Sequence, residues 1–197
     1  LDDLITFKVQ AVKEMTPLPE AIHNKLKDLL RTFYLVGGMP EAVSAWITNH
    51  DFLACGRVHN DILDTYRQDF AKYKKRVSPD LLRQVLRSVA LQAGQKFVFA
   101  QAPVKHTTAN GLPLGAEENE KYVKYLFLDL GLMQTMLSLP VSNILQASDV
   151  DFVNKGAASE MFAGLELLKA QDCFVKPEMF YWQNTSKGTI GEIDYLT

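Results

Sequence analysis

Apolar side chains recur at every third or fourth position through most of the first 92 residues. An α-helix has about 3.6 residues per turn, so this period gathers the apolar side chains on one face, which then needs a partner to pack against. Between residues 18 and 33, the apolar positions are Ile22, Leu26, Leu29, Leu30 and Phe33. The pattern predicts an array of amphipathic helices up to residue 92.

Three further helices of this array can be placed from the residues at their ends. Gly37 and Gly38 permit a sharp bend after the first helix, and Pro40 suits the first position of the next one. A long helix is predicted over residues 52–74, and Ser78 is expected to cap a fourth helix that begins at Pro79. The second helix is predicted to carry Ala42, Val43, Trp46 and Ile47 on one side. The side chains predicted to face the core are, for the next two helices, Ile62, Leu63, Tyr66, Phe70 and Tyr73; and Leu82, Val85, Leu86 and Val89.

Strands enter the pattern after residue 95, so the predicted fold class is α+β and mainly α. Asn110-Gly111 is a strong turn signal, and Asp129 suits the cap of a following helix. The predicted elements are strands at residues 96–99, 122–128, 179–183 and 191–196 and helices at residues 130–139 and 156–170. These elements divide the chain into predicted units at residues 1–92, 93–145 and 146–197.

Composition excludes several classes of protein. With 47% hydrophobic and 22% charged residues, the chain can bury a core, and its apolar runs are far shorter than a membrane span. No leader opens it, so we expect a cytoplasmic protein without membrane contact. The net charge of −2 gives no global attraction for nucleic acid, so any such contact must come from a local patch. Cys55 and Cys173 are predicted to be reduced thiols.

Two acids near the C-terminal end form a candidate metal site. Glu192 and Asp194 are two apart on a predicted strand, so their side chains share a face, and Glu160 on the preceding helix can converge on them. Carboxylates are the ligands that magnesium prefers, and metal-dependent nucleases use them to hold it. The alternative is that Glu160 lies on a solvated helix face and the strand acids are edge charges that discourage pairing.

A second candidate site is the basic cluster of Lys72, Lys74, Lys75 and Arg76, beside the aromatic residues of the long helix. Interleaved cations and aromatic rings can follow a nucleic-acid backbone. Cations at a helix C-terminus also complement the helix dipole, and the rings fall on the stripe predicted to be buried, so a structural helix end is the other interpretation.

Four segments together resemble one large family. They are YLVGGMPEAV at residues 34–43, DILDTYRQDF at 61–70, LFLDLGL at 126–132, and Tyr181-Trp182 followed by Glu192-Ile193-Asp194. In this order they resemble the C-terminal part of prokaryotic AAA+ ATPase-like proteins that carry the domain of unknown function DUF4143, which is similar to PD-(D/E)XK nuclease domains. The resemblance implies a helical lid, a winged-helix-like middle and the start of a nuclease-like α/β unit.

The chain departs from that family in three places. It lacks a Gly-x-x-x-x-Gly-Lys-Ser/Thr phosphate loop, so ATP would bind in an N-terminal ATPase domain that is missing here. Residues 100–103 leave no room for a recognition helix, and we expect a segment to be missing at this seam. The strand with Glu-x-Lys would lie beyond Thr197, and we expect both ends of the chain to be cuts in a longer protein.

The resemblance implies that Asp194 and Glu160 bind magnesium, with Glu192 in support, if the nuclease-like site is active. The piece itself is expected to be inactive and to carry no cofactor. We expect it to be an accessory region that binds DNA or a partner protein. The alternative is a non-catalytic adaptor or regulatory module in a defence or toxin-antitoxin setting.

Overall fold

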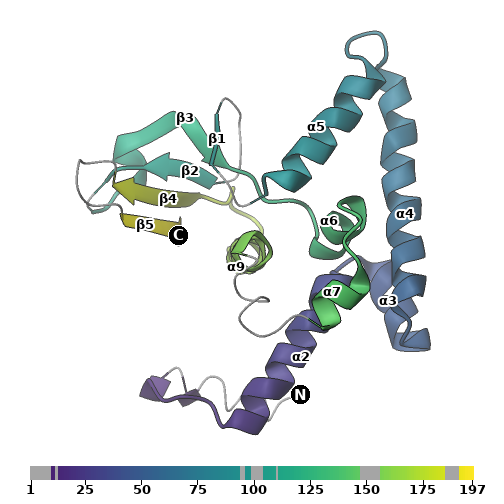
Figure 1. The fold of residues 1–197 in the computed structure, drawn as a ribbon. Helices are drawn as coiled ribbons and strands as arrows, with labels where there is room; N and C mark the ends of the chain where they lie inside the picture. The colour runs from purple at the N-terminus through teal and green to yellow at the C-terminus, as the bar shows by residue number, and fades with distance from the viewer. Residues whose placement is uncertain are drawn as a thin grey trace.

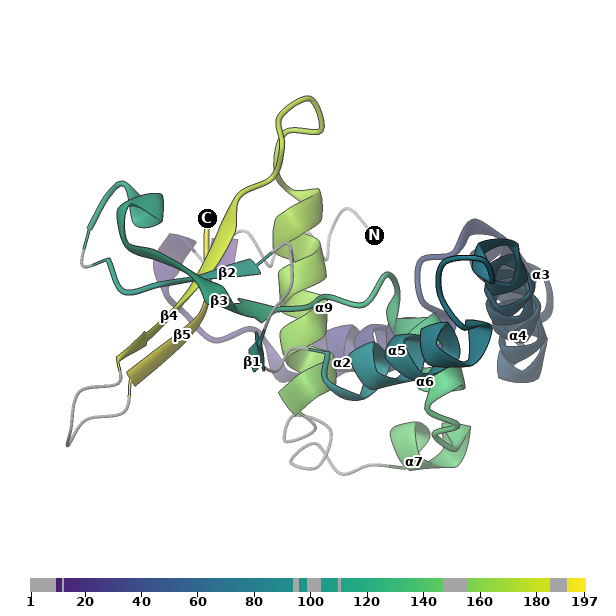
Figure 2. The ribbon, with the colours of Figure 1, turned by 90° about the horizontal axis from the view of Figure 1, so that it is seen from above.

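The computed structural model describes residues 10–11, 13–93, 96–98, 104–109, 111–146, 156–184 and 191–197. The fold is α+β and mainly α, as predicted: helices form one end of the molecule and a small sheet forms the other (Figure 1). Helix α9 (Gly156–Lys169) lies between the two ends in both views of the ribbon (Figure 2). The expected seam at residues 100–103 lies outside the described residues.

The first bend of the chain depends on a glycine. Helix α2 (Glu20–Val36) ends at Gly37, whose φ of 68° lies in the left-handed region that other residues rarely adopt. Helix α3 (Pro40–Asn49) then begins with proline in its first turn, as predicted. Of the residues predicted to share one side of α3, Ala42 is completely buried and Ile47 is 68% exposed.

A long helical hairpin follows. Its elements are α4 (Phe52–Asp69), the 3-10 turn η1 (Phe70–Tyr73) and α5 (Pro79–Leu91). Asp51 caps α4 by accepting hydrogen bonds from the backbone N–H groups of Leu53 and Ala54. Ser78 is the N-cap residue of α5 and Pro79 lies in its first turn, as predicted, but the Ser78 side chain makes no capping hydrogen bond.

The outer end of this hairpin reaches beyond the core. Leu63 of α4 is buried, but Tyr66 and Tyr73 are 41% and 57% exposed, and Val85 of α5 is 50% exposed. The prediction that these three side chains face the core is therefore wrong. Helical periodicity defines a face, but the last buried residue of α4 is Leu63, so its final turn extends beyond the core.

The sheet has five strands in the order β1-β3-β2-β4-β5. They are β1 (Lys96–Val98), β2 (Val104–Thr107), β3 (Glu118–Lys124), which follows the 3-10 turn η2 (Leu114–Glu117), β4 (Met179–Asn184) and β5 (Gly191–Leu196). Strands β2 and β4 are parallel, and the other pairs are antiparallel. Strands from both sides of the predicted boundary at residue 145 thus share one sheet.

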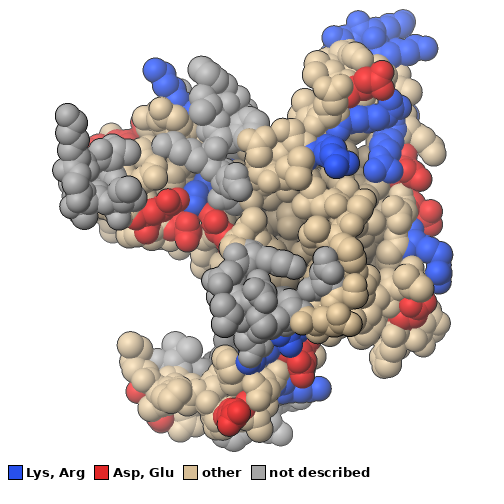
Figure 3. Space-filling model, in the orientation of Figure 1, with Lys and Arg blue, Asp and Glu red and all other residues tan. Residues whose placement is uncertain are grey.

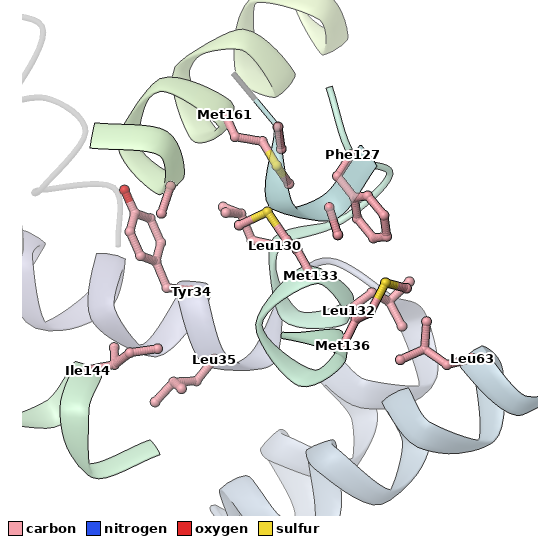
Figure 4. Packing of buried hydrophobic residues seen from close by; sticks show 13 residues of the cluster. Tyr34, Leu35, Leu63, Phe127, Leu130, Leu132, Met133, Met136, Ile144 and Met161 are labelled. Atoms are coloured by element: carbon pink, nitrogen blue, oxygen red, sulfur yellow. The ribbon is translucent and has the colours of Figure 1, made fainter. Parts of the chain in front are cut away.

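The largest hydrophobic core surrounds helix α6 (Leu130–Met136) (Figure 4). Strand β3 ends at Lys124, four residues before the predicted end, and the chain then leads into α6. Helix α7 (Val141–Leu145) adds Ile144 to this core. The buried core side chains come from α2, α4, α5, α6, α7 and α9 and include Tyr34, Leu35, Leu63, Leu130, Leu132, Met133, Met136, Ile144 and Met161.

Two turn segments about ninety residues apart meet at the start of α6. Asp129 caps α6 by accepting a hydrogen bond from Leu132 N–H at 2.9 Å, as predicted, and its other oxygen accepts one from Gly38 N–H at 2.6 Å. A Cβ atom on Gly37 would lie 2.2 Å from Asp129 Oδ1, so only glycine fits there. The bend after α2 therefore leaves room for the Asp129 carboxylate at Gly37 and binds it through the N–H group of Gly38.

The buried ring of His59 lies at the same place, where α2, α4 and α6 meet. Its Nε2 lies 3.1 Å from the carbonyl oxygen of Val36, and its Nδ1 lies 3.1 Å from Thr135 Oγ1. A Cβ atom on Gly131 would lie 2.6 Å from His59 Cε1. Helices α2, α4 and α6 are thus joined by polar contacts as well as by the core.

Candidate functional site

The acids predicted from the C-terminal segment converge on a lysine. Glu160 comes from α9, Glu192 and Asp194 come from β5, and Lys124 is the last residue of β3. Lys124 Nζ lies 2.7 Å from Glu160 Oε1, 2.9 Å from Glu192 Oε1 and 2.9 Å from Asp194 Oδ1. The structure therefore brings the three acids together, and we call these four residues the acid-lysine cluster.

Close packing of α9 on the sheet positions the acid-lysine cluster. A Cβ atom on Gly164 would lie 2.7 Å from both Leu126 Cδ2 and Tyr195 Cζ, so glycine lets the helix approach the sheet at this point. Glu160 is one turn earlier on α9 and points at the strands. Strand β5 is held by antiparallel pairing with β4, so Glu192 and Asp194 reach the same lysine from one face.

Burial differs strongly among the four side chains. The side chain of Lys124 is 3% exposed and that of Glu160 is 21% exposed, whereas Glu192 and Asp194 are 39% and 57% exposed. An ammonium group has three N–H donors, and each of them here has its own carboxylate. The buried charge is thus fully hydrogen-bonded.

The charges in the acid-lysine cluster are unequal. One ammonium faces three carboxylates, so two negative charges remain. Burial alone would lower the pKa of Lys124, but its hydrogen bonds to the carboxylates outweigh burial and raise that pKa. The pKa of Glu160 is also raised, because burial and the two neighbouring acids outweigh the attraction of Lys124.

Tyr181, which is buried, and Tyr195, which is partly buried, border the acid-lysine cluster. The ring centre of Tyr181 lies 5.1 Å from Lys124 Nζ. Burial raises the pKa of Tyr181 to about 12, although the nearby lysine opposes the rise. Burial likewise raises the pKa of Tyr195. The hydroxyl oxygens of both tyrosines have no hydrogen-bond partner in the described part of the chain.

The arrangement does not fit a magnesium ion. Among the residues that the structure describes, no group of three or more His, Cys, Asp or Glu side chains could hold a metal. The lysine ammonium occupies the point on which the carboxylates converge, where a cation would have to bind. Lys124 therefore takes the place of a metal cation among these carboxylates.

Sequence reasoning missed Lys124 because it sought the lysine of the site on a strand after Asp194. One signal was available. Lys124 interrupts the otherwise apolar and aromatic run of residues 122–128, and a charged side chain inside such a run must find a partner when the run is buried. Which partner it finds depends on strand pairing and helix placement across the sheet.

The predicted basic residues lie at the outer end of the α4–α5 hairpin. Lys72 pairs with Asp69 at 2.6 Å, and its pKa is raised by that hydrogen bond. Lys74, Lys75 and Arg76 form no ion pair with the residues that the structure describes. Lys and Arg side chains gather at this end of the molecule in the space-filling view (Figure 3).

Exposed aromatic rings accompany these cations. Tyr66 and Tyr73 are 41% and 57% exposed, and neither side chain makes a hydrogen bond or ring contact with the described residues. We call Tyr66, Tyr73, Lys74, Lys75 and Arg76 the hairpin tip. The prediction that its rings are buried is wrong, so burial in the core cannot explain why they are there.

Comparison with known proteins gives one match. Residues 27–110 match a family described as domain of unknown function DUF8612. No curated protein and no solved structure matches the chain. The match covers less than half of the chain; it includes the hairpin tip and excludes Glu160, Glu192 and Asp194.

This finding corrects the expected resemblance. The matching family is DUF8612 and neither DUF4143 nor a domain associated with AAA+ ATPases, so that assignment is wrong. The expectations of ATP binding and of a missing ATPase domain lose their basis with it. The described helices include none that is long and apolar enough to cross a membrane. Both Cys55 and Cys173 are free, as predicted.

Proposed function

We propose that this chain is a non-catalytic nucleic-acid-binding module whose contact surface is the hairpin tip. The observation that carries the proposal is the combination of two exposed tyrosines with three consecutive cations that form no ion pair within the described part of the chain. Such a local patch can bind phosphates even though the net charge of the chain is −2.

Helix capping explains only part of this surface. Cations near the C-terminus of α4 interact favourably with its dipole, but the effect falls off within the last turn. Arg67 and Lys72 already lie near that end, each in an ion pair with an acid. Lys74, Lys75 and Arg76 follow beyond it. The dipole also gives no reason for exposed tyrosine rings, which a nucleic-acid contact would explain.

The acid-lysine cluster supports the non-catalytic part of the proposal. A metal-dependent nuclease needs open carboxylate oxygens around a cation, with water bound to it. Here the three carboxylates are bound to Lys124, which is held in place by burial. We infer that the cluster fastens α9 and β5 to the sheet. A role in a defence or toxin-antitoxin setting stays a prediction.

Fluorescence anisotropy with labelled DNA and RNA strands of mixed sequence tests the proposal. The variant Lys74→Ala/Lys75→Ala/Arg76→Ala should bind much more weakly than the wild type at low salt. The slope of log affinity against log salt should fall by roughly two to three units, since each phosphate contact contributes about 0.7 to 0.9.

A matched control removes the same charge elsewhere. Lys25, Lys121 and Lys176 are exposed and lie outside the hairpin tip, so their triple alanine variant should keep most of the affinity. Equal losses in the two triple variants would contradict a local surface. Cleavage of the strands in magnesium that disappears in Asp194→Asn would overturn the non-catalytic part of the proposal.

A further inference from the structure

The exposed tyrosines of the hairpin tip lie about two turns apart at the outer end of the hairpin. Tyr66 belongs to the end of α4, and Tyr73 is the last residue of the 3-10 turn η1 that continues α4, so roughly 10 to 13 Å of helix separates them. Phe70 lies between them in the sequence and is only partly buried. Lys74, Lys75 and Arg76 follow directly after Tyr73.

Rings and cations in this order match the requirements of a single strand. Unpaired bases offer a free face on which an aromatic side chain can stack, whereas the bases of a duplex are already stacked on one another. Cations that follow the rings along the chain can then hold the phosphates on either side of a stacked base. A surface that binds duplex phosphates alone needs the cations and has no use for exposed rings.

We infer that the hairpin tip binds single-stranded nucleic acid in preference to duplex. Tyr66 and Tyr73 stack on bases, and Lys74, Lys75 and Arg76 contact phosphates. The inference rests on the proposed function and deepens it, since it names the class of nucleic acid. Stacking and phosphate contacts are available to every base, so we expect little dependence on base sequence.

The first test needs no variant. We would measure binding of the wild-type chain to a labelled 20-nucleotide single strand, as DNA and as RNA, and to the 20-base-pair DNA duplex at the same salt concentration. Stacking of one or two bases should make at least one of the single strands bind about tenfold or more tightly than the duplex. A single strand in which the central nucleotides lack bases should bind about as weakly as the duplex, because it keeps the phosphates and loses the stacking.

The second test changes the rings. Tyr66→Ala/Tyr73→Ala should lose roughly fivefold or more in affinity for the single strand, with little change in duplex binding or in the salt slope. Tyr66→Phe/Tyr73→Phe keeps the rings and should bind like the wild type. Both tyrosines are exposed, so circular dichroism should show that all variants keep the fold.

The outcomes separate the inference from the proposed function. Equal affinity for duplex and single strands, or an alanine variant that binds like the wild type, would overturn the single-strand inference and leave nucleic-acid binding intact. A chain that binds neither form at low salt would overturn the proposed function itself. In that case the exposed rings and cations would belong to a protein interface.

Discussion

Replacing Lys124 with methionine is the most direct test of the acid-lysine cluster. Methionine has nearly the length of lysine and fills its apolar space, so the variant removes the charge with little change of volume. Three carboxylates are then left around a site whose central side chain was 3% exposed. We expect α9 and β5 to lose their common attachment to β3.

The expected cost follows from the burial of each partner. Removing one member of a buried ion pair costs about 3 to 5 kcal/mol, because the remaining charge is left without compensation. Glu192 and Asp194 are 39% and 57% exposed, so water can solvate them in the variant and their share is small. Glu160, at 21% exposed, carries most of the penalty. We therefore expect a loss near the lower limit, about 3 kcal/mol in the free energy of unfolding.

Urea unfolding followed by circular dichroism measures this loss at pH 7. The difference between Lys124→Met and the wild type should shrink as the pH falls to about 4, because protonation of the carboxylates removes the charges that the variant leaves unpaired. Lys121→Met changes an exposed lysine on the same strand and should cost less than about 0.5 kcal/mol. A Lys124→Met variant as stable as the Lys121→Met control would refute the reasoning.

Three further predictions concern the junction of α2, α4 and α6. Gly131→Ala should lower the free energy of unfolding by about 1 to 3 kcal/mol, because its Cβ would press on the His59 ring. Its control is Gly56→Ala in α4, whose Cβ would meet no atom within 4 Å; in the same urea assay it should stabilise the protein by up to about 1 kcal/mol. Asp129→Ala should cost about 1 to 3 kcal/mol, since two backbone N–H groups lose their acceptor; an unchanged unfolding midpoint would contradict that role. Burial lowers the pKa of His59, so as the pH falls the unfolded chain binds this proton before the folded chain does. The free energy of unfolding should therefore fall as the pH drops below about 6.5, and His59→Gln should flatten this dependence.

Local patterns in the sequence predicted the candidate acids well. Period-two alternation placed Glu192 and Asp194 on one face of a strand whose bounds were correct, and helical periodicity placed Glu160 on α9. Their partner could not be found in this way. Lys124 is 36 residues from Glu160 and 70 from Asp194, and its position depends on the parallel pairing of β2 with β4. No local periodicity encodes a pairing of that kind.

The exposure of the hairpin tip could not be predicted from periodicity. The pattern predicts that Tyr66 and Tyr73 share a stripe with Leu63, but of the three only Leu63 is buried. Burial requires a second element opposite the stripe as well as the stripe itself. The last buried residue of α4 is Leu63, and the length of a helix relative to its core is a property of the whole fold.

Helix α6 has a practical consequence for anyone who wishes to study the hairpin tip alone. The buried side chains of α6 fill the space between α2, α4 and α5, although α6 begins about forty residues after the end of α5. A truncated protein that stops at residue 92 would keep every residue of the tip and lose the centre of the scaffold that supports it. We expect such a fragment to aggregate or to stay partly unfolded, so a minimal expression clone should extend at least through Met136.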